Sequence, residues 1–218
     1  MTGGDTRRAR LARAHLYLVT DSGMPMQRLD AALTGGVAMV QLRDRSLDDA
    51  QLLEVAARFR ELCDRHGALF WINDRPDLAR AAGADGVHVG QDDVAVGDVR
   101  AEVGEDVLIG LSTHTPHQLE AALASGADQL SVGPVWETPT KPGRAAAGLD
   151  YVRHAARRAP ELPWFAIGGI DTGTVGQVVE AGARRIVVVR AVRDATDPGA
   201  AAAALVEAVN GAPGGTTQ

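Results

Sequence analysis

The amino-acid sequence predicts an α/β protein with a single domain, a (β/α)8 TIM barrel, and three observations support that fold class. Eight short apolar runs recur along the 218 residues, with helical patterns between them. Most runs are continuously apolar, which is typical of parallel strands buried on both faces. They begin about 18 to 35 residues apart, which leaves room for one crossover helix after each strand. An open, doubly wound sheet is the alternative, but eight β-α units favour a closed barrel.

Aromatic residues are scarce in the sequence, at 4%, so the core is expected to be built largely from Val, Leu, Ile and Ala. Glycine stands just before several of the predicted strands, as at Gly67, Gly126 and Gly182, where it is expected to close the preceding helix. In chain order, the strands are expected at residues 15–20, 37–43, 68–72, 86–89, 107–110, 129–132, 164–167 and 185–189.

The helices between these strands carry recognisable end signals, and residues 47–66 show them best. Apolar residues recur in this segment at spacings of three and four, as on one face of a helix. Ser46 and Asp48 stand where an N-cap is needed, and Gly67 follows as a C-terminal glycine. The segment therefore predicts one long crossover helix.

The barrel is expected to occupy residues 14–210 as the catalytic domain, between an N-terminal tail at 1–13 and a C-terminal tail at 211–218. No composition shift inside the barrel range suggests a linker. Chain ends are commonly disordered. We therefore expect a solvated tail to carry the only cluster of basic residues, Arg7, Arg8, Arg10 and Arg13.

Composition and charge exclude several functional classes. The formal net charge of -6 argues against nucleic-acid binding, which usually needs a basic surface. No apolar stretch reaches the roughly 20 residues that cross a bilayer, and no secretory signal is evident, so we expect no membrane association and a cytoplasmic location. Cys63 is the sole cysteine and cannot form an internal disulfide. We expect it to be a buried or half-buried helical residue.

Basic and amide side chains alternate at the end of the second predicted strand. Gln41, Arg43 and Arg45 fall on one side of it, so all three are expected to point into the barrel mouth. Guanidinium groups there favour a phosphorylated ligand, because their planar fork matches phosphate oxygens. The alternative is a layer of structural ion pairs with neighbouring aspartates. Asp44 is expected to face outward with a structural role.

Acidic residues follow the third and fourth predicted strands, at Asn73-Asp74 and at Asp92-Asp93. Carboxylates on neighbouring strand ends suit Mg²⁺, which takes one or two protein carboxylates together with substrate phosphate. The alternative is that these aspartates cap the helices that follow. Their position beside the basic cluster favours a metal–phosphate site.

Ser112 follows the fifth strand and has two open roles, donating its hydroxyl to phosphate or capping the helix that starts near Pro116. His88, His114 and His117 have no metal-ligand spacing, and no Ser–His or Cys–His pair is evident. We expect these histidines to be structural or to line a ligand.

Glycine and loop residues complete the candidate site. Gly168-Gly169 ends the seventh strand and begins a helix, so its backbone amides form a candidate anion site. Val189-Arg190 completes the same corner from the eighth strand, where barrels frequently bind phosphate. The long loop 133–148 carries Lys141 and is expected to act as a lid.

Taken in order, these segments resemble the thiamine phosphate synthase family over about residues 16–208. The most specific elements are the Asn-Asp-Arg sequence at 73–75, the Gly-Gln-x-Asp sequence at 90–93 and the Thr-x-Thr-Lys sequence at 138–141. Less specific support comes from the segments 17–20, 41–45, 86–89, 109–114, 132–137 and 166–170.

The resemblance implies a (β/α)8 barrel that joins an aminopyrimidine methyl diphosphate to a thiazole phosphate and releases diphosphate, with Mg²⁺ as cofactor. Its substrates would be small molecules; whether the chain forms a homo-oligomer is left open. The resemblance assigns the metal to Asp74 and Asp93, and catalysis to Lys141, Arg43 and Ser112. It assigns the pyrimidine diphosphate to Gln41, Arg43, Arg45, Asn73, Ser112 and Lys141, and the thiazole phosphate to Thr138, Thr140, Gly169, Val189 and Arg190.

Two positions depart from the family's pattern, which usually has Lys in place of Arg45 and Ser in place of Arg190. Arg45 keeps the charge but changes the donor geometry. Arg190 is bulkier than Ser, which makes its ligand contact less secure than that of Gly169. Two alternative functions are a thiazole tautomerase, which would not need the metal aspartates, and a non-catalytic phosphate-binding barrel.

Overall fold

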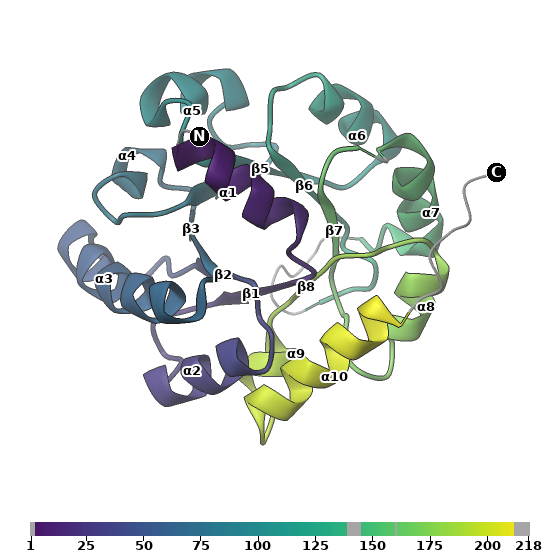
Figure 1. Ribbon diagram of the computed structural model, residues 1–218. Helices are drawn as coiled ribbons and strands as arrows, with labels where there is room; N and C mark the ends of the chain where they lie inside the picture. The colour runs from purple at the N-terminus through teal and green to yellow at the C-terminus, as the bar shows by residue number, and fades with distance from the viewer. Residues whose placement is uncertain (1–2, 139–144, 160, 212–218) are drawn as a thin grey trace.

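The computed structural model describes residues 3–138, 145–159 and 161–211, and its eight parallel strands close into a barrel in chain order (Figure 1). β1 pairs with β8 as well as with β2, so the predicted closed barrel is confirmed and the open sheet is excluded. The strands are β1 (Leu16–Thr20), β2 (Met39–Leu42), β3 (Leu69–Asn73), β4 (Gly86–Val89), β5 (Leu108–Thr113), β6 (Gln129–Val132), β7 (Trp164–Ile167) and β8 (Ile186–Val188).

The helices after the first surround the barrel as an outer layer, and the first lies across one end of it (Figure 1). None of those in the described part of the chain combines the length and apolar character needed to cross a membrane. They are α1 (Gly3–Ala12), α2 (Met26–Thr34), α3 (Asp49–His66), α4 (Pro76–Ala79), α5 (Val96–Val103), α6 (Pro116–Leu123), α7 (Gly148–Arg158), α8 (Val175–Glu180), α9 (Arg190–Arg193) and α10 (Pro198–Asn210).

The end signals predicted for the long helix are present in α3. The Asp48 side chain accepts a hydrogen bond from the Gln51 backbone N–H, and the Gln51 side chain returns one to Asp48, which forms a capping box. Gly67 ends the helix with a left-handed φ of +66°. Cys63 is fully buried in this helix, as expected, and burial raises the pKa of its thiol to about 12.

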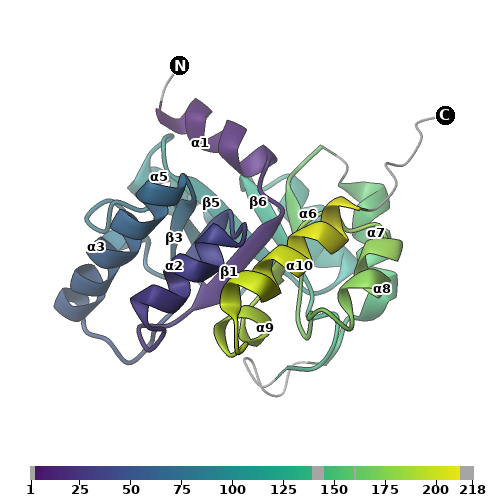
Figure 2. The same cartoon turned by 60° about the horizontal axis from the view of Figure 1, so that its bottom comes forward.

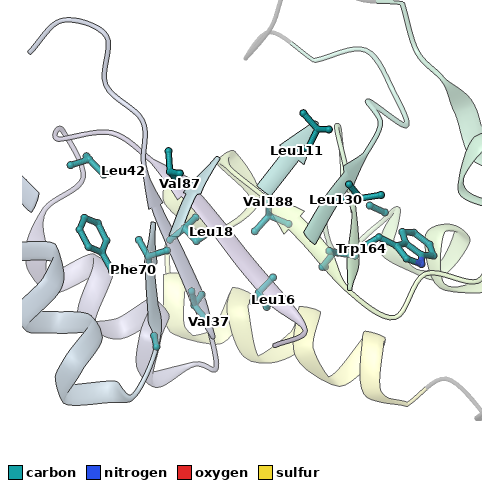
Figure 3. Packing of buried hydrophobic residues seen from close by; sticks show 14 of the residues in the cluster. Leu16, Leu18, Val37, Leu42, Phe70, Val87, Leu111, Leu130, Trp164 and Val188 are labelled. Carbon is teal, nitrogen blue, oxygen red and sulfur yellow. The ribbon is translucent and has the colours of Figure 1, made fainter. Parts of the chain in front are cut away.

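Alternating strand residues build two apolar layers, as β1 shows. Leu16 and Leu18 point outward into the layer between strands and helices, which Figure 3 shows for a wider set of residues. Tyr17 points into the barrel, where its ring lies 6.1 Å from that of Trp71 and 5.7 Å from that of Phe165. These rings fill the barrel below the carboxyl ends of the strands, so that end remains open for a site.

The N-terminal segment is a helix, and the prediction of a solvated tail at residues 1–13 is wrong for its described part. α1 lies across one end of the barrel (Figure 2), with Leu11 only 1% exposed in the interior apolar cluster. Its arginines are held at this end, since Arg7 pairs with Asp85 at 2.9 Å and Arg8 with Asp128 at 2.8 Å. Ion pairing and burial of Leu11 therefore order a segment whose composition resembles a tail.

Asp128 joins three elements at the closed end of the barrel. Its carboxylate receives Arg8 from α1, Arg100 from α5 at 2.6 Å, and the backbone N–H of Ile109 in β5 at 2.9 Å. With its side chain only 9% exposed, the charge depends on these donors. The same arrangement recurs at Asp85, with Arg7, Arg60 and the Phe70 N–H as donors.

We expect Asp128→Ala to destabilise the fold by about 3 kcal/mol, because it leaves two arginines and a backbone N–H without their shared acceptor. Urea unfolding followed by circular dichroism measures this. The matched control is Asp150→Ala, whose carboxylate pairs with Arg153 but is 96% exposed. We expect the control to lie within about 0.5 kcal/mol of the parent. Equal effects of the two variants would contradict the anchoring role.

Candidate active site

Two adjoining cavities open at the carboxyl ends of the strands, where barrel enzymes place their active sites. The inner cavity, in the barrel mouth, has a volume of about 50 Å³, and the outer cavity, beside β7 and β8, about 370 Å³. The shared wall consists of Ser112, Ser131, Ile167, Val187 and Val189. Ligands in the two cavities would therefore lie in contact.

The inner cavity presents amide groups and one unpaired cation. Gln41, Arg43 and Asn73 line it, and the Gln41 amide donates a hydrogen bond to the Tyr17 hydroxyl. Burial, with the nearby Arg45 charge, lowers the pKa of Arg43, although Asp74 opposes this. The Arg43 Nε is buried without a hydrogen-bond partner among the described residues. A half-buried guanidinium with a spare donor is suited to an anionic ligand.

Ser112 stands on the wall between the cavities and is held from inside the barrel. The His88 Nε2 lies 2.9 Å from the Ser112 Oγ, and the Gln129 Nε2 lies 2.9 Å from the His88 Nδ1. All three side chains are buried. Gly110 lies between them in the register, and a Cβ there would overlap both Gln129 and His88. The glycine therefore leaves space for the buried hydrogen bonds.

The outer cavity is built on a glycine turn after β7. Gly168 and Gly169 have φ values of +104° and +70°, and a Cβ on Gly168 would lie 2.5 Å from Pro134. Backbone hydrogen bonds tie this turn to the start of the long loop, from Val135 to Ile167 at 2.8 Å and from Trp136 to Gly168 at 3.2 Å. Only glycine combines this backbone with this close approach. The turn leaves backbone groups facing the cavity, as in anion sites of barrels.

Two carboxylates follow the carboxyl ends of neighbouring strands, and neither of them lines either of the two cavities. Asp74 follows β3 with an unusual φ of +57°, and its Oδ2 is 3.1 Å from Arg45. Asp93 follows β4, where its Oδ2 accepts the Gly90 N–H at 2.7 Å. No group of three or more His, Cys, Asp or Glu side chains suited to a metal occurs among the described residues. A pair of carboxylates fits Mg²⁺, because substrate phosphate and water complete its shell.

The alternative capping roles are wrong for Asp74 and Ser112. The N-cap of α4 is Arg75, without a side-chain cap hydrogen bond. The N-cap of α6 is Thr115, whose hydroxyl accepts the Gln118 N–H, while Ser112 lies within β5. Both residues are thus free of helix-capping duties.

Arg45 differs from its prediction. It lines neither cavity, its side chain is 72% exposed, and it pairs with Asp74 at the rim. The alternation of a strand does not extend to it, because β2 ends at Leu42 and the chain bends at Arg45 and Ser46. Asp44 has the expected structural role, since its carboxylate accepts hydrogen bonds from the hydroxyls of Ser22 and Ser46, both at 2.6 Å.

The hydrogen bonds from Ser22 and Ser46 lower the pKa of Asp44 to about 2. A depressed carboxyl pKa contributes stability that is present above the unfolded pKa of about 3.9 and is lost as the pH falls through the folded pKa. We therefore expect Asp44→Asn to lower stability at pH 7 by about 1 kcal/mol, after discounting for solvent exposure. Urea unfolding between pH 7 and pH 2 should show a smaller acid loss in the variant; an unchanged pH profile would contradict this.

The remaining predicted residues divide between the cavities. The sequence analysis did not identify Gln129, Ser131 or the hydrogen bond between the His114 imidazole and the Gly133 carbonyl. His117 is exposed on α6 and lines neither cavity. Thr140 and Lys141 lie outside the described residues. Ser112 lines both cavities, Gln41, Arg43 and Asn73 line the inner one, Thr138, Gly169 and Arg190 line the outer one, and Val189 lines both.

Fold and site together define a (β/α)8 barrel enzyme with a two-part pocket suited to anionic small molecules. The family model described as thiamine monophosphate synthase matches residues 16–192, and the chain belongs to this family. It is a transferase of thiamine biosynthesis.

Relatives with known names are similar to this chain over most of its length. The thiamine-phosphate synthase of Acidothermus cellulolyticus is 54% identical over 201 residues, covering 90% of this chain and 95% of its own length. That of Streptomyces avermitilis is 53% identical over 203 residues, covering 91% and 94%. Among solved structures, thiamine phosphate pyrophosphorylase from Pyrococcus furiosus superposes with a TM-score of 0.84 at 30% identity, over 95% of this chain and 99% of that one. A 3-hexulose-6-phosphate synthase, at 20% identity and a TM-score of 0.66, shares the fold alone.

Proposed function

We propose that the chain condenses 4-amino-2-methyl-5-pyrimidinylmethyl diphosphate with a thiazole phosphate to give thiamine phosphate and diphosphate. The observation that carries this proposal is the pair of adjoining cavities with five shared wall residues. One cavity has an unpaired cation and amide groups, and the other has a glycine turn. Such a pair is suited to holding two phosphorylated compounds against each other.

Each cavity would receive one substrate. The amides of Gln41 and Asn73 suit the ring nitrogens and amino group of the pyrimidine, and Arg43 and Ser112 suit the diphosphate. The thiazole phosphate would lie in the outer cavity, against Gly169 and the start of α9 at Val189 and Arg190. Thr138 and Thr140 would complete that site. Arg45, at the rim, and Lys141 would neutralise diphosphate charge.

The reaction needs a leaving group stabilised and two rings aligned. The bond between the pyrimidine methylene carbon and the diphosphate oxygen breaks, and its electron pair leaves with diphosphate. The lone pair of the thiazole nitrogen then forms the new bond to the methylene carbon. No protein base is required, which agrees with the polar and cationic lining of the cavities. Positioning and charge stabilisation by Arg43, Ser112 and Lys141 would supply the rate enhancement.

Asp74 and Asp93 would hold a Mg²⁺ ion next to the diphosphate. When bound, this ion neutralises charge on the leaving oxygens. In each carboxylate one oxygen, Oδ2, already accepts a hydrogen bond, from Arg45 in Asp74 and from the Gly90 N–H in Asp93.

We place this biosynthetic reaction in the cytoplasm, since both substrates carry phosphate charges that keep them inside a membrane-bounded compartment.

Diphosphate release tests the proposal. The pyrimidine diphosphate is incubated with the protein and Mg²⁺, alone and with the thiazole phosphate, and diphosphate is quantified. We expect release in proportion to the thiazole phosphate consumed. Isomerisation of a thiazole without diphosphate release would favour a tautomerase. Binding of both compounds without turnover would favour a regulatory barrel.

A further inference from the structure

The hydrogen bonds that join the buried side chains of Gln129, His88 and Ser112 have a direction, and the last two of these residues line the inner cavity. The side-chain nitrogen of Gln129, which can only donate, faces the His88 Nδ1 at 2.9 Å. The Nδ1 must therefore accept, and the imidazole hydrogen belongs on Nε2 when the ring is neutral. From there it points to the Ser112 Oγ, also at 2.9 Å.

This direction fixes how Ser112 can act. Because its oxygen accepts the His88 N–H, its own hydrogen is left to point elsewhere, and Ser112 lines both cavities. An anionic oxygen in either cavity needs a donor, so a hydroxyl oriented in this way is ready to bind it without turning. The reverse direction would commit the Ser112 hydrogen to His88 and present a lone pair to the anion.

We propose that Gln129 is a positioning residue, which fixes the tautomer of His88 and thereby makes the Ser112 hydroxyl a donor to the departing diphosphate. Gln129 lines neither cavity, is 0% exposed, and acts only through His88. Gly110 makes this arrangement possible, because any larger residue there would occupy the space of the hydrogen bond between Gln129 and His88. The inference rests on the proposed function for the identity of the anion. The direction of the hydrogen bonds from Gln129 through His88 to Ser112 does not depend on it.

Two nearly isosteric variants of Gln129 separate the effect of its hydrogen bond from the effect of its packing. Gln129→Met removes the donor, and Gln129→Glu replaces it with an acceptor that favours a hydrogen on the His88 Nδ1. We expect either change to lower kcat by about fivefold to tenfold, the value of one neutral hydrogen bond, with KM for the thiazole phosphate unchanged. In an Ser112→Ala background, neither change should lower kcat further, because these hydrogen bonds then have no hydroxyl to orient.

The control is Thr113→Val, the next residue of β5. Its side chain is equally buried but lines neither cavity, and its hydroxyl donates to the Ser131 carbonyl and accepts from the Tyr151 hydroxyl. This variant should lose stability and keep kcat. Additive losses in the Gln129 and Ser112 double variant, or a kcat loss in the control equal to that in Gln129→Met, would overturn the proposal.

Nitrogen-15 NMR of the histidine rings tests the direction without any turnover. The parent should show His88 as the Nε2–H tautomer, and Gln129→Glu should move the hydrogen to Nδ1. Titration with inorganic diphosphate and Mg²⁺ should show about fivefold weaker binding to Gln129→Met. An Nδ1–H tautomer in the parent would overturn the inference even if the protein is a synthase. The expected tautomer and diphosphate binding, with no thiamine phosphate formed, would instead refute only the proposed function.

Discussion

Replacing Arg43 with methionine is expected to lower kcat/KM for thiamine phosphate formation by about 100- to 1,000-fold, while the barrel remains folded. Arg43 lines the inner cavity, has no ion pair among the described residues, and keeps a buried Nε without a partner. Its positive charge is already partly desolvated, which lowers the pKa of the guanidinium. Removing such a charge should leave the free energy of unfolding unchanged or raise it slightly.

Steady-state kinetics and urea unfolding on the same preparations separate these effects. Arg43→Lys is the conservative variant, and it should recover part of the loss, since it restores charge without the planar fork. Arg153→Met on α7 is the matched control, because its side chain is 50% exposed and pairs with Asp150. A fall in stability with retained activity in Arg43→Met would identify Arg43 as a structural residue.

Asp93→Asn is expected to lower kcat by about 100- to 1,000-fold at limiting Mg²⁺, because a carboxylate that holds the ion is lost. The side chain is exposed, and its hydrogen bond to the Gly90 N–H can persist through the amide oxygen, so stability should hardly change. The apparent Mg²⁺ requirement should move to higher concentration. Kinetics over a Mg²⁺ series measure both effects.

Asp98→Asn provides the control for the Asp93 experiment. Asp98 is an exposed aspartate in the first turn of α5, five residues further along the chain and outside both cavities. Its replacement changes the net charge by the same amount and should leave the Mg²⁺ dependence unaltered. Equal shifts in the two variants would mean that general electrostatics, rather than metal binding, explains the Asp93 result.

The barrel was predictable because its strands are buried on both faces. Continuous apolar runs such as 164–167 and glycines at helix ends such as Gly67 are local signals. Each predicts a structural element without knowledge of distant contacts, and both elements are present in the fold. The lining positions Gln41 and Arg43 were predictable because the alternation of side chains along a strand fixes the side on which they lie. Alternation predicts side-chain direction only within the regular strand, and Arg45, which lies in the bend after β2 and is exposed, shows this limit.

The long-range contacts were not predicted from the sequence. The arginines of α1 have the composition of a solvated tail. The segment is ordered because Arg7 and Arg8 pair with Asp85 and Asp128, which lie 78 and 120 residues away in the sequence. A weak signal existed, because a Gly-Ala-Asp tripeptide precedes both β4 and β6. The Gln129–His88–Ser112 chain joins three strands, and no spacing in the sequence indicates which side chains will meet inside a barrel.

Direct detection of thiamine phosphate tests the central claim. The purified protein is mixed with 4-amino-2-methyl-5-pyrimidinylmethyl diphosphate and thiazole phosphate, with Mg²⁺ or with chelator, and the product is followed by mass spectrometry. The two-cavity account predicts thiamine phosphate and diphosphate in equal amounts, with formation dependent on Mg²⁺. A folded protein that forms no thiamine phosphate under these conditions, with either the carboxylated or the decarboxylated thiazole, would contradict it.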